Sequence, residues 1–146
     1  MNIKLGTILI AGLLYSAISA MAQKGVLTKA EAKNEMKNGM KNGLWLEYMD
    51  IKGKSTTDTA APYYMLSMYK RGKKNGLTNS YSKSGNLQSS TPYKDDKING
   101  TATYYYENGK VKGESTWKNG SWVSRKDYDE NGKEVYIDEN GLQHYK

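Results

Sequence analysis

A repeat of 24 residues in the middle of the chain constrains the fold more than any other feature. Asn75-Gly76 begins one copy and Asn99-Gly100 begins the next, and six matched positions keep this spacing without a gap. Self-similarity at a fixed period indicates an architecture of stacked, similar units. The other matched pairs are Tyr81 with Tyr105, Gly85 with Gly109, Leu87 with Val111, Tyr93 with Trp117, and Asp96 with Gly120.

The pattern extends beyond these two copies in both directions. Upstream it contains one extra residue and then an insertion around positions 55–62, and downstream it lacks one residue. We therefore expect about four units, of which the middle two are the most regular. The further counterparts are Asn42-Gly43, Tyr48, Gly53, Tyr69 and Gly72 upstream, and Gly120, Tyr128, Gly132 and Val135 downstream.

Each unit has the pattern of two strands joined by a tight turn. Residues 101–106 alternate in the way that places successive side chains on opposite faces of a sheet. Asn108-Gly109 follows, and Asn-Gly is typical of hairpins because both residues tolerate positive φ angles. We predict an all-β fold, an antiparallel meander of tandem β-hairpins, with Gly109 at a positive φ.

Stacked hairpins align the large side chains of successive units in columns, because neighbours share an apolar face that one hairpin cannot bury alone. The chain has 13 tyrosines, three tryptophans and no phenylalanine, so its large contacts come from rings with a polar tip, which suits a thin fold. Pro92 cannot donate a ladder hydrogen bond, so we expect a bulge or a late strand start there. The columns are Tyr48, Tyr81, Tyr105 and Tyr128; Leu87 and Val111; and Tyr69, Tyr93 and Trp117.

The first 22 residues have the character of a secretory signal peptide. Lys4 precedes an uncharged run from Leu5 to Ile18, and small residues follow at Ala20 and Ala22. This run is shorter than the roughly 18 to 20 residues of a membrane span, so we favour cleavage over an uncleaved anchor. The chain has no cysteine for a disulfide or for the lipid anchor of bacterial lipoproteins. We expect export to the periplasm or the extracellular space, with cleavage after Ala22.

Residues 23–41 stand apart from the repeat. Thr28 and Glu31 have the spacing of a capping box, and residues 30–37 contain neither glycine nor proline, so one short helix is compatible. Its apolar face is thin, and a flexible arm is equally compatible. The chain thus divides into a signal peptide with its helix (1–22), an arm or short helix (23–41) and a repeat domain (42–146).

The run Gly100-x4-Tyr105-x2-Asn108-Gly109-Lys110 resembles the MORN repeat (membrane occupation and recognition nexus), and more closely its bacterial variant. Trp117-Lys118-Asn119-Gly120 and Tyr128-x2-Asn131-Gly132-Lys133 fit the same pattern, and the resemblance covers residues 42–142. It implies a MORN-like repeat sheet that acts as a scaffold or binding module. Many bacterial members carry the label of a YwqK-type antitoxin, and eukaryotic relatives were linked to phospholipids. The resemblance implies no catalytic residue.

The residues offer little material for catalysis or metal binding. His144 is the only histidine and lies close to the C-terminus. A carboxylate pair such as Asp127 with Glu114 has the composition of a glycosidase pair, but such residues are common on hairpin surfaces. Asp129-Glu130-Asn131-Gly132 and Asp138-Glu139-Asn140-Gly141 lack the ligand spacing of a calcium loop and are typical of turns. We predict no enzyme, no cofactor and no metal site.

The densest basic run is the first candidate for binding. Lys70, Arg71, Lys73 and Lys74 lie on a predicted turn between the first two units. Such a run attracts anionic lipid head groups or phosphorylated envelope polymers. It can equally be a solvated turn whose lysines protect strand edges from aggregation, and we favour that interpretation.

Tyrosines are the second candidate. Tyr104 and Tyr106 flank the column residue Tyr105, so at least one ring is expected on the opposite face, where aromatic rings can dock a partner. We expect first a non-enzymatic protein-interaction or scaffold module of the bacterial cell envelope, whose partner the sequence does not name. A binding protein for anionic lipid or envelope glycan comes second, and an antitoxin, immunity partner or hydrolase last. Nucleic acid is not expected, because export separates the protein from it and no recognition motif occurs.

We predict that the exported protein begins at Gln23, because Ala20 and Ala22 occupy the positions where the signal peptidase requires small side chains. Mass spectrometry of the exported protein measures this terminus directly. An intact Met1 would contradict the prediction.

Overall fold

The computed structural model describes residues 27–137 and 143–145. The predicted signal peptide, its cleavage site after Ala22 and the turn predicted at Asn140-Gly141 lie outside the described residues. No helix within the described ranges is long and apolar enough to cross a membrane.

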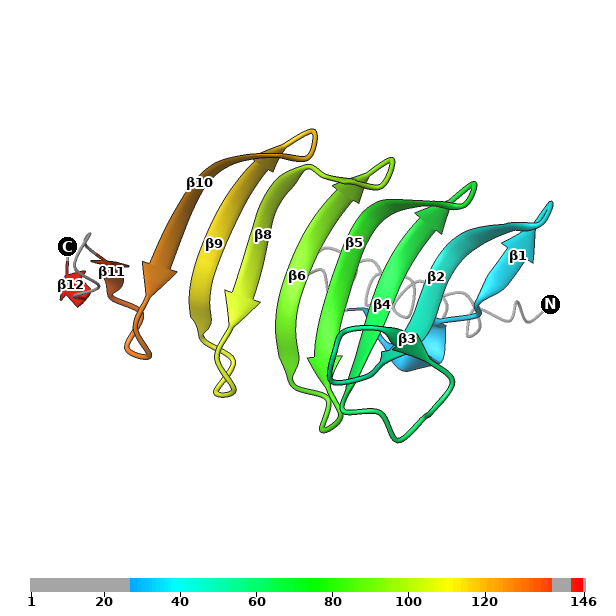
Figure 1. The fold of residues 1–146 in the computed structure, drawn as a ribbon, viewed down its shortest axis with the longest axis horizontal. Coiled ribbons are helices and arrows are strands. Elements are labelled where there is room, and N and C mark those ends of the chain that lie inside the picture. The colour runs from blue at the N-terminus through cyan, green and yellow to red at the C-terminus, as the bar shows by residue number, and fades with distance from the viewer. Residues whose placement is uncertain (1–26, 138–142, 146) are drawn as a thin grey trace, which may run out of the picture.

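The described chain forms one 12-stranded antiparallel sheet, which confirms the predicted meander of hairpins (Figure 1). Ten strands lie side by side in chain order, while β3 pairs only with β2 and β7 only with β6. The strands are β1 (Glu35–Lys37), β2 (Met40–Met49), β3 (Ser55–Thr56), β4 (Tyr63–Lys70), β5 (Lys73–Ser82), β6 (Leu87–Lys94), β7 (Lys97–Ile98), β8 (Gly100–Tyr105), β9 (Val111–Lys118), β10 (Ser121–Tyr128), β11 (Glu134–Ile137) and β12 (Gln143–Tyr145).

Four turns along the lower edge of the sheet in Figure 1 share one hydrogen-bond pattern. Each turn has five residues, and the first donates its N–H to the carbonyl of the fifth. The fourth residue is a glycine, and it donates its N–H to the carbonyl of the first. In the unit that carries Gly109 these bonds join Tyr106 to Lys110 and Gly109 to Tyr106, each at 2.9 Å. Gly109 has φ +81°, as predicted. The four lower turns are 50–54, 82–86, 106–110 and 129–133.

The upper turns have a different geometry and are tied to their neighbours. Both central residues of each turn have positive φ, which is the type I′ geometry that matches strand twist. In three of these turns the second central residue also donates its N–H to the preceding hairpin. The acceptor is the carbonyl of the residue that immediately precedes an Asn-Gly pair. These bonds run from Gly72 to Lys41 (2.8 Å), from Asp96 to Lys74 (3.0 Å) and from Gly120 to Ile98 (2.8 Å). The upper turns are Asn38-Gly39, Arg71-Gly72, Asp95-Asp96 and Asn119-Gly120.

The Asn-Gly pairs that begin the two regular units interrupt the strand pairing, and both are called bulges here. Asn75-Gly76 lies inside β5, whereas Asn99-Gly100 joins β7 to β8. Their glycines are required. Gly76 and Gly100 have φ +118° and +119° and lie opposite Tyr93 and Trp117. A Cβ atom on Gly76 would lie 2.9 Å from the Cβ of Met68, closer than real Cβ contacts. Only glycine therefore fits both the backbone angle and the space.

Pro92 perturbs the sheet at a different place from the one predicted. β6 runs through Pro92 without starting late, and Pro92 pairs directly with Leu77. The pairing toward the other neighbour is interrupted instead, because Pro92 has no N–H to donate to that side. Its carbonyl accepts the N–H of Asn99 at 3.0 Å, where the neighbouring segment divides into β7 and β8.

The segment before the repeat forms neither an α-helix nor a free arm over its described part. Its capping box, Thr28 with Glu31, supports only a 3-10 turn, η1 (Lys29–Glu31). Asn34 then adopts φ +48°, which ends any helix, and its side-chain amide pairs with the backbone of Leu46 at 2.7 and 3.0 Å. β1 follows and pairs with β2 through the Asn38-Gly39 turn, so the sheet begins inside this segment.

The insertion before β4 is a loop with one short strand. Thr56 of β3 pairs with Tyr48 of β2. The carboxylate of Asp58 accepts the N–H of Ala60 at 2.8 Å, and Ala61 is buried. The loop therefore folds back on the first hairpin and leaves the order of the main strands unchanged.

The two faces of the sheet differ. One, called here the core face, carries the small hydrophobic core, in which the Tyr64 and Tyr81 rings stack 4.9 Å apart. Leu27 and Ala32 from the N-terminal segment pack on it. The opposite side is called the aromatic face and carries Trp45, Tyr69, Tyr93, Trp117 and Trp122. The core-face side chains are Leu44, Leu46, Tyr48, Tyr64, Leu66, Tyr81 and Leu87.

Replacing Gly109 with valine should lower the free energy of unfolding by about 1 to 3 kcal/mol through backbone strain alone, because no atom lies within 4 Å of the added Cβ. Gly109→Asn should cost less, since asparagine tolerates positive φ. Urea unfolding of the two variants and the parent chain measures the difference. Equal stability of the valine variant and the parent would contradict the assigned turn.

Candidate binding surfaces

The aromatic face repeats one cross-strand arrangement in three units. Tyr69, Tyr93 and Trp117 lie directly opposite Gly43, Gly76 and Gly100, so each ring has a partner without a side chain. Successive rings are two strands apart, or about 9 to 10 Å at ordinary strand spacing. The result is a periodic row of half-buried rings across the sheet.

Tryptophans extend this row at both ends. Trp45 lies at its start, with its ring centroid 6.1 Å from that of Tyr69 in an edge-to-face arrangement. Trp122 pairs with Trp117 at the other end, and 59% of its surface is exposed. Edge-to-face rings attract each other beyond their buried area. The aromatic face is therefore a supported layer of rings with an exposed tryptophan at one end.

Cationic side chains alternate with the rings. The Lys41 Nζ atom lies 4.6 Å from the Trp45 ring centroid and 4.8 Å from that of Tyr69. The Lys74 Nζ atom lies 5.2 Å from the Tyr93 ring. Farther along, the Arg125 guanidinium carbon lies 5.5 Å from the Tyr104 ring. These distances are within the range of cation–π attraction.

A carboxylate completes the first part of this cluster. Glu47 forms an ion pair with Lys41 and accepts a hydrogen bond from the Tyr69 hydroxyl at 3.2 Å. Burial, and then the nearby negative charge of Glu47, raise the pKa of Tyr69 well above its ordinary value of 10.0. The Tyr69 hydroxyl is therefore a hydrogen-bond donor at any physiological pH.

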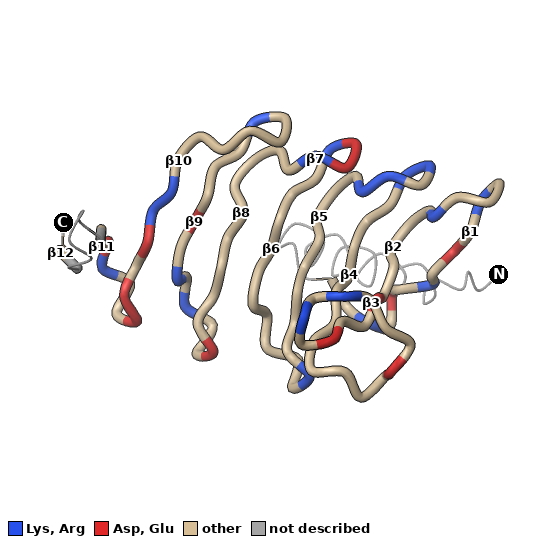
Figure 2. Tube along the Cα trace, in the orientation of Figure 1, with Lys and Arg blue, Asp and Glu red and all other residues tan. Residues whose placement is uncertain are grey.

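The predicted basic run divides into exposed and half-buried members. Lys70, Arg71 and Lys73 are exposed at the β4–β5 turn. Lys74 is half-buried against Tyr93, and burial lowers its pKa. Figure 2 shows that basic residues gather along this upper edge, where one acidic turn, Asp95-Asp96, interrupts them.

A hollow lies beside the basic turn. Its volume is about 330 Å³, and it lies between the β1–β2 and β4–β5 turns. It therefore combines three cations with amide groups and an exposed methionine at one edge of the sheet. The lining residues are Lys37, Asn38, Met40, Asn42, Lys70 and Arg71.

The two candidate tyrosines are not brought together with the basic turn. Tyr104 pairs with Gly113 on the aromatic face, opposite to the face of Tyr105, as predicted for at least one of these rings. Tyr106 lies at a lower turn, where its hydroxyl donates to the carbonyl of Tyr128 at 2.8 Å. Tyr106 therefore joins two hairpins, and only Tyr104 extends the row of cations and rings.

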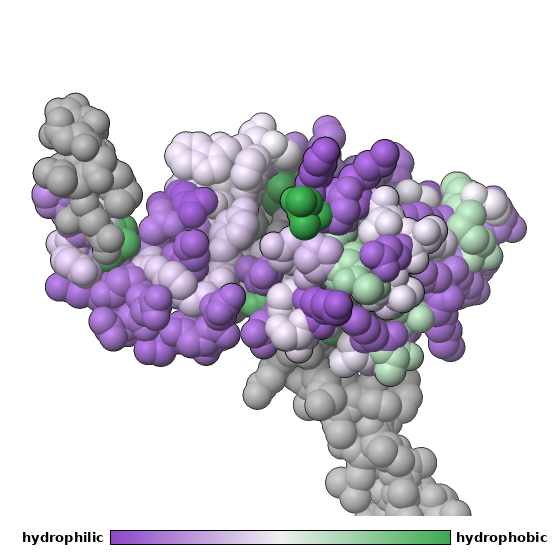
Figure 3. Space-filling view, turned by 60° about the horizontal axis from the view of Figure 1, so that its bottom comes forward, coloured by the Kyte–Doolittle hydropathy of each residue, from purple (hydrophilic) through white to green (hydrophobic). Residues whose placement is uncertain are grey.

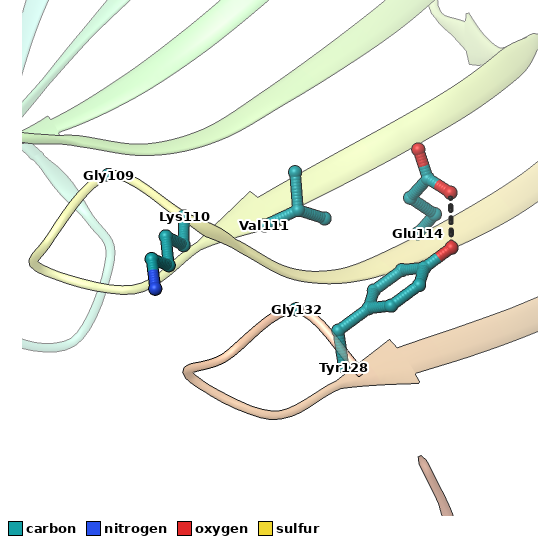
Figure 4. Close-up of a pocket in the computed structure, with 6 residues that line it drawn as sticks. All are labelled: Gly109, Lys110, Val111, Glu114, Tyr128 and Gly132. Carbon is teal, nitrogen blue, oxygen red and sulfur yellow. Dashed lines mark hydrogen bonds between the residues drawn. The ribbon is translucent and has the colours of Figure 1, made fainter. Parts of the chain in front are cut away.

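A second hollow, of about 470 Å³, opens between two lower turns, 106–110 and 129–133 (Figure 4). The Tyr128 hydroxyl donates to a carboxylate oxygen of Glu114 at 3.1 Å across it. Desolvation, and then this carboxylate, raise the pKa of Tyr128. Gly109, Lys110, Val111 and Gly132 complete its lining.

The structure also locates the residues considered for catalysis and metal binding. Asp127 pairs with Gly113 and Glu114 with Lys126, so the two carboxylates point to opposite faces. Asp129 accepts the N–H groups of Asn131 and Lys133 at 2.9 Å, and the Lys133 N–H lowers its pKa most. In the described ranges no three His, Cys, Asp or Glu residues are grouped for a metal ion. The other acidic turn, from Asp138, lies outside those ranges.

Sequence reasoning missed parts of both surfaces. Lys41, Trp45 and Glu47 are all odd-numbered positions of one strand and therefore share a face, which was a usable signal. Asn38-Gly39 is a standard hairpin sequence, and it was not read as the turn that begins the sheet. The Glu114–Tyr128 contact joins different strands and has no signal in local sequence.

The fold and these surfaces define a class of protein, the tandem β-hairpin repeat proteins. The family model described as "MORN repeat variant" matches residues 74–95 and 98–119, which are the two regular units. The MORN repeat family is a family of binding modules and is not known for enzymatic activity. No curated protein and no solved structure matches the chain.

The raised pKa of Tyr69 predicts a loss of stability at alkaline pH. Tyrosines of the unfolded chain ionise near 10.0, whereas Tyr69 in the folded chain ionises only at higher pH. Its contribution is therefore complete below pH 10.0 and is lost as the pH rises through the folded pKa. Urea unfolding between about pH 8 and about pH 11 should show a smaller loss for Tyr69→Phe than for the parent chain. An equal loss in both would contradict the proposed burial of this hydroxyl.

Proposed function

We propose that the protein is a non-enzymatic interaction module of the cell envelope that presents its aromatic face to a protein partner. The observation that carries this proposal is the periodic row of half-buried rings, with Trp122 largely exposed at one end. The N-terminal segment packs on the core face, on the other side of the sheet. The envelope location rests on the predicted signal peptide.

The composition of the aromatic face suits a protein interface. Tryptophan, tyrosine and arginine are the residues that most often dominate binding energy in protein complexes. Seen from the side of the lower turns, the surface is mostly hydrophilic, and hydrophobic residues form only small separate patches (Figure 3). Recognition would therefore depend on rings and paired charges rather than on a broad apolar patch. The antitoxin label of bacterial relatives names one kind of protein partner, and the proposal does not depend on it.

Capture from a periplasmic fraction tests this proposal. The parent chain should retain a protein partner in stoichiometric amount, and Trp122→Ser should reduce recovery about tenfold, the effect of losing an interface hot spot. Ile51→Ser is the matched control, because Ile51 is 81% exposed in the lower turn 50–54, at the opposite edge of the sheet from Trp122. Retention unaffected by Trp122→Ser, or no stoichiometric partner at all, would count against the proposal.

A second candidate function is binding of anionic lipid head groups or envelope glycans. The observation that favours it is the hollow beside the basic turn, where Lys37, Lys70 and Arg71 converge. Each exposed cation is worth about 1 kcal/mol near an anionic membrane, and salt screens it within about 10 Å at 0.1 M. Three or four such charges give weak attraction at physiological salt, so this function ranks second.

Co-sedimentation with vesicles rich in anionic lipid tests the second candidate. We expect weak or no binding at physiological salt. A variant with glutamine at Lys70, Arg71 and Lys73 removes the exposed cations but keeps Lys74, which packs on Tyr93. Glutamine at Lys52, Lys54 and Lys83 makes the same charge change at the lower turns and is the control. Firm, salt-sensitive binding that only the first variant loses would reverse our ranking.

A further inference from the structure

One row of side chains crosses the lower part of the core face from the first unit to the last. Tyr48 pairs with Tyr64, Tyr64 with Tyr81, Tyr81 with Leu87, and Tyr105 with Val111. Tyr128 ends the row on β10, where its hydroxyl reaches Glu114. We call this set the lower row; its members are Tyr48, Tyr64, Tyr81, Leu87, Tyr105, Val111 and Tyr128.

The chain itself occupies the first half of the lower row. Leu27 and Ala32 pack against Tyr64 and Tyr81. The Tyr81 hydroxyl donates to the backbone carbonyl of Leu27 at 2.8 Å, and the Lys29 Nζ atom lies 3.7 Å from the Tyr64 ring centroid. A short segment is thus held by an apolar side chain, a tyrosine-to-carbonyl hydrogen bond and a lysine over a ring.

The second half of the lower row offers the same kinds of groups around the open hollow of Figure 4. Val111 supplies an apolar wall, and Tyr128 supplies a ring and a hydroxyl. Glu114 adds a half-buried carboxylate. The equivalent position one repeat earlier, 24 residues before it, is Ser90, so the first half lacks this charge. This carboxylate would attract a basic side chain lying over the neighbouring ring.

We propose that this half of the lower row is a docking site for a short peptide segment of a partner protein. The segment places an apolar side chain against Val111 and a lysine or arginine beside Glu114 and Tyr128. The site lies on the same row as the contact already made by residues 27–32. Lys126 is the cross-strand neighbour of Glu114, but the two form no ion pair within the described residues, so the charge of Glu114 is complementary to the bound cation. The inference rests on the proposed function, because its occupant is a protein, but it uses the face opposite to the aromatic one.

A second copy of the chain is the less favoured occupant. Its residues 27–32 have the required chemistry, but they already pack on their own core face. Releasing them would expose Tyr64 and Tyr81, whose stacked rings belong to the small core. A separate segment of similar chemistry binds without that loss.

The test uses the full chain and a blocked synthetic peptide with the sequence of residues 27–33, Leu-Thr-Lys-Ala-Glu-Ala-Lys. Amide resonances of the chain are followed by NMR during titration. We expect saturable shifts centred on Val111, Glu114 and Tyr128, with a Kd on the order of 1 mM. Glu114→Gln should weaken binding about tenfold, the effect of losing a charged hydrogen-bond partner. Glu107→Gln makes the same charge change at a neighbouring exposed position and should leave the affinity unchanged.

A second peptide carries glutamate in place of the lysine at its third position, and it tests the proposal even if a chain variant does not fold. This peptide should bind at least about tenfold more weakly than the first. Shifts confined to Tyr64 and Tyr81 would show exchange with the chain's own segment and would overturn the proposal. Absence of saturable shifts, or equal binding of both peptides, would also overturn it. If the peptide does not bind while a partner is still captured through Trp122, only this inference is wrong. If the peptide does not bind and no partner is captured, the proposed function is wrong as well.

Discussion

The structure depends on one backbone contact that recurs along the upper edge. In each regular unit the carbonyl just before an Asn-Gly bulge accepts the N–H of the next upper turn, as from Asp96 to Lys74 and from Gly120 to Ile98. The bulge requires a glycine at φ near +118°, and the turn requires two residues at positive φ. Each bond contributes only about 1 kcal/mol, but it sets the position of one hairpin relative to the previous one. The columns of side chains follow from that position.

A sheet one layer thick has two faces, and this chain uses them differently. The core face buries Leu66 with the stacked Tyr64 and Tyr81 and uses residues 27–32 as a partial cover. The aromatic face buries small side chains, among them Ser67 and Ala102. Its row of rings crosses the sheet two residues away from these small side chains along the strands. Both faces retain half-buried tyrosines, whose polar tips tolerate contact with water. A thin fold therefore keeps binding groups on both sides without a deep core.

The 24-residue repeat predicted most of the fold. The 24-residue spacing between Asn75-Gly76 and Asn99-Gly100 predicted the repeat units. Asn108-Gly109 predicted a tight turn, in which Gly109 has a positive φ but Asn108 does not. The N-terminal segment was harder, because the capping pair Thr28 and Glu31 is a local helix signal, while the side chain of Asn34 bonds a strand 12 residues away. Pro92 was understood as a perturbation, but its effect fell on the neighbouring strand, because its missing N–H faces that neighbour.

The candidate surfaces were only partly visible in the sequence. The basic turn was evident as a run, yet the half-burial of Lys74 against Tyr93 depends on the fold. Lys41, Trp45 and Glu47 are odd-numbered positions of one strand, so the sequence indicates that they share a face. The hydrogen bond between Tyr128 and Glu114 joins two strands and depends on how those strands lie together. Residues within one strand reveal a shared face, and residues on different strands meet only once the register is known.

Native-state hydrogen exchange of the upper-turn amides tests the central claim most directly. If the turn-to-bulge bonds hold the repeat together, the amides of Gly72, Asp96 and Gly120 should be protected, although they lie in surface turns. Replacing Gly100 with alanine should then remove protection at Gly120 while Gly72 stays protected. Exchange of all three amides at the rate of unbonded surface turns would contradict the account.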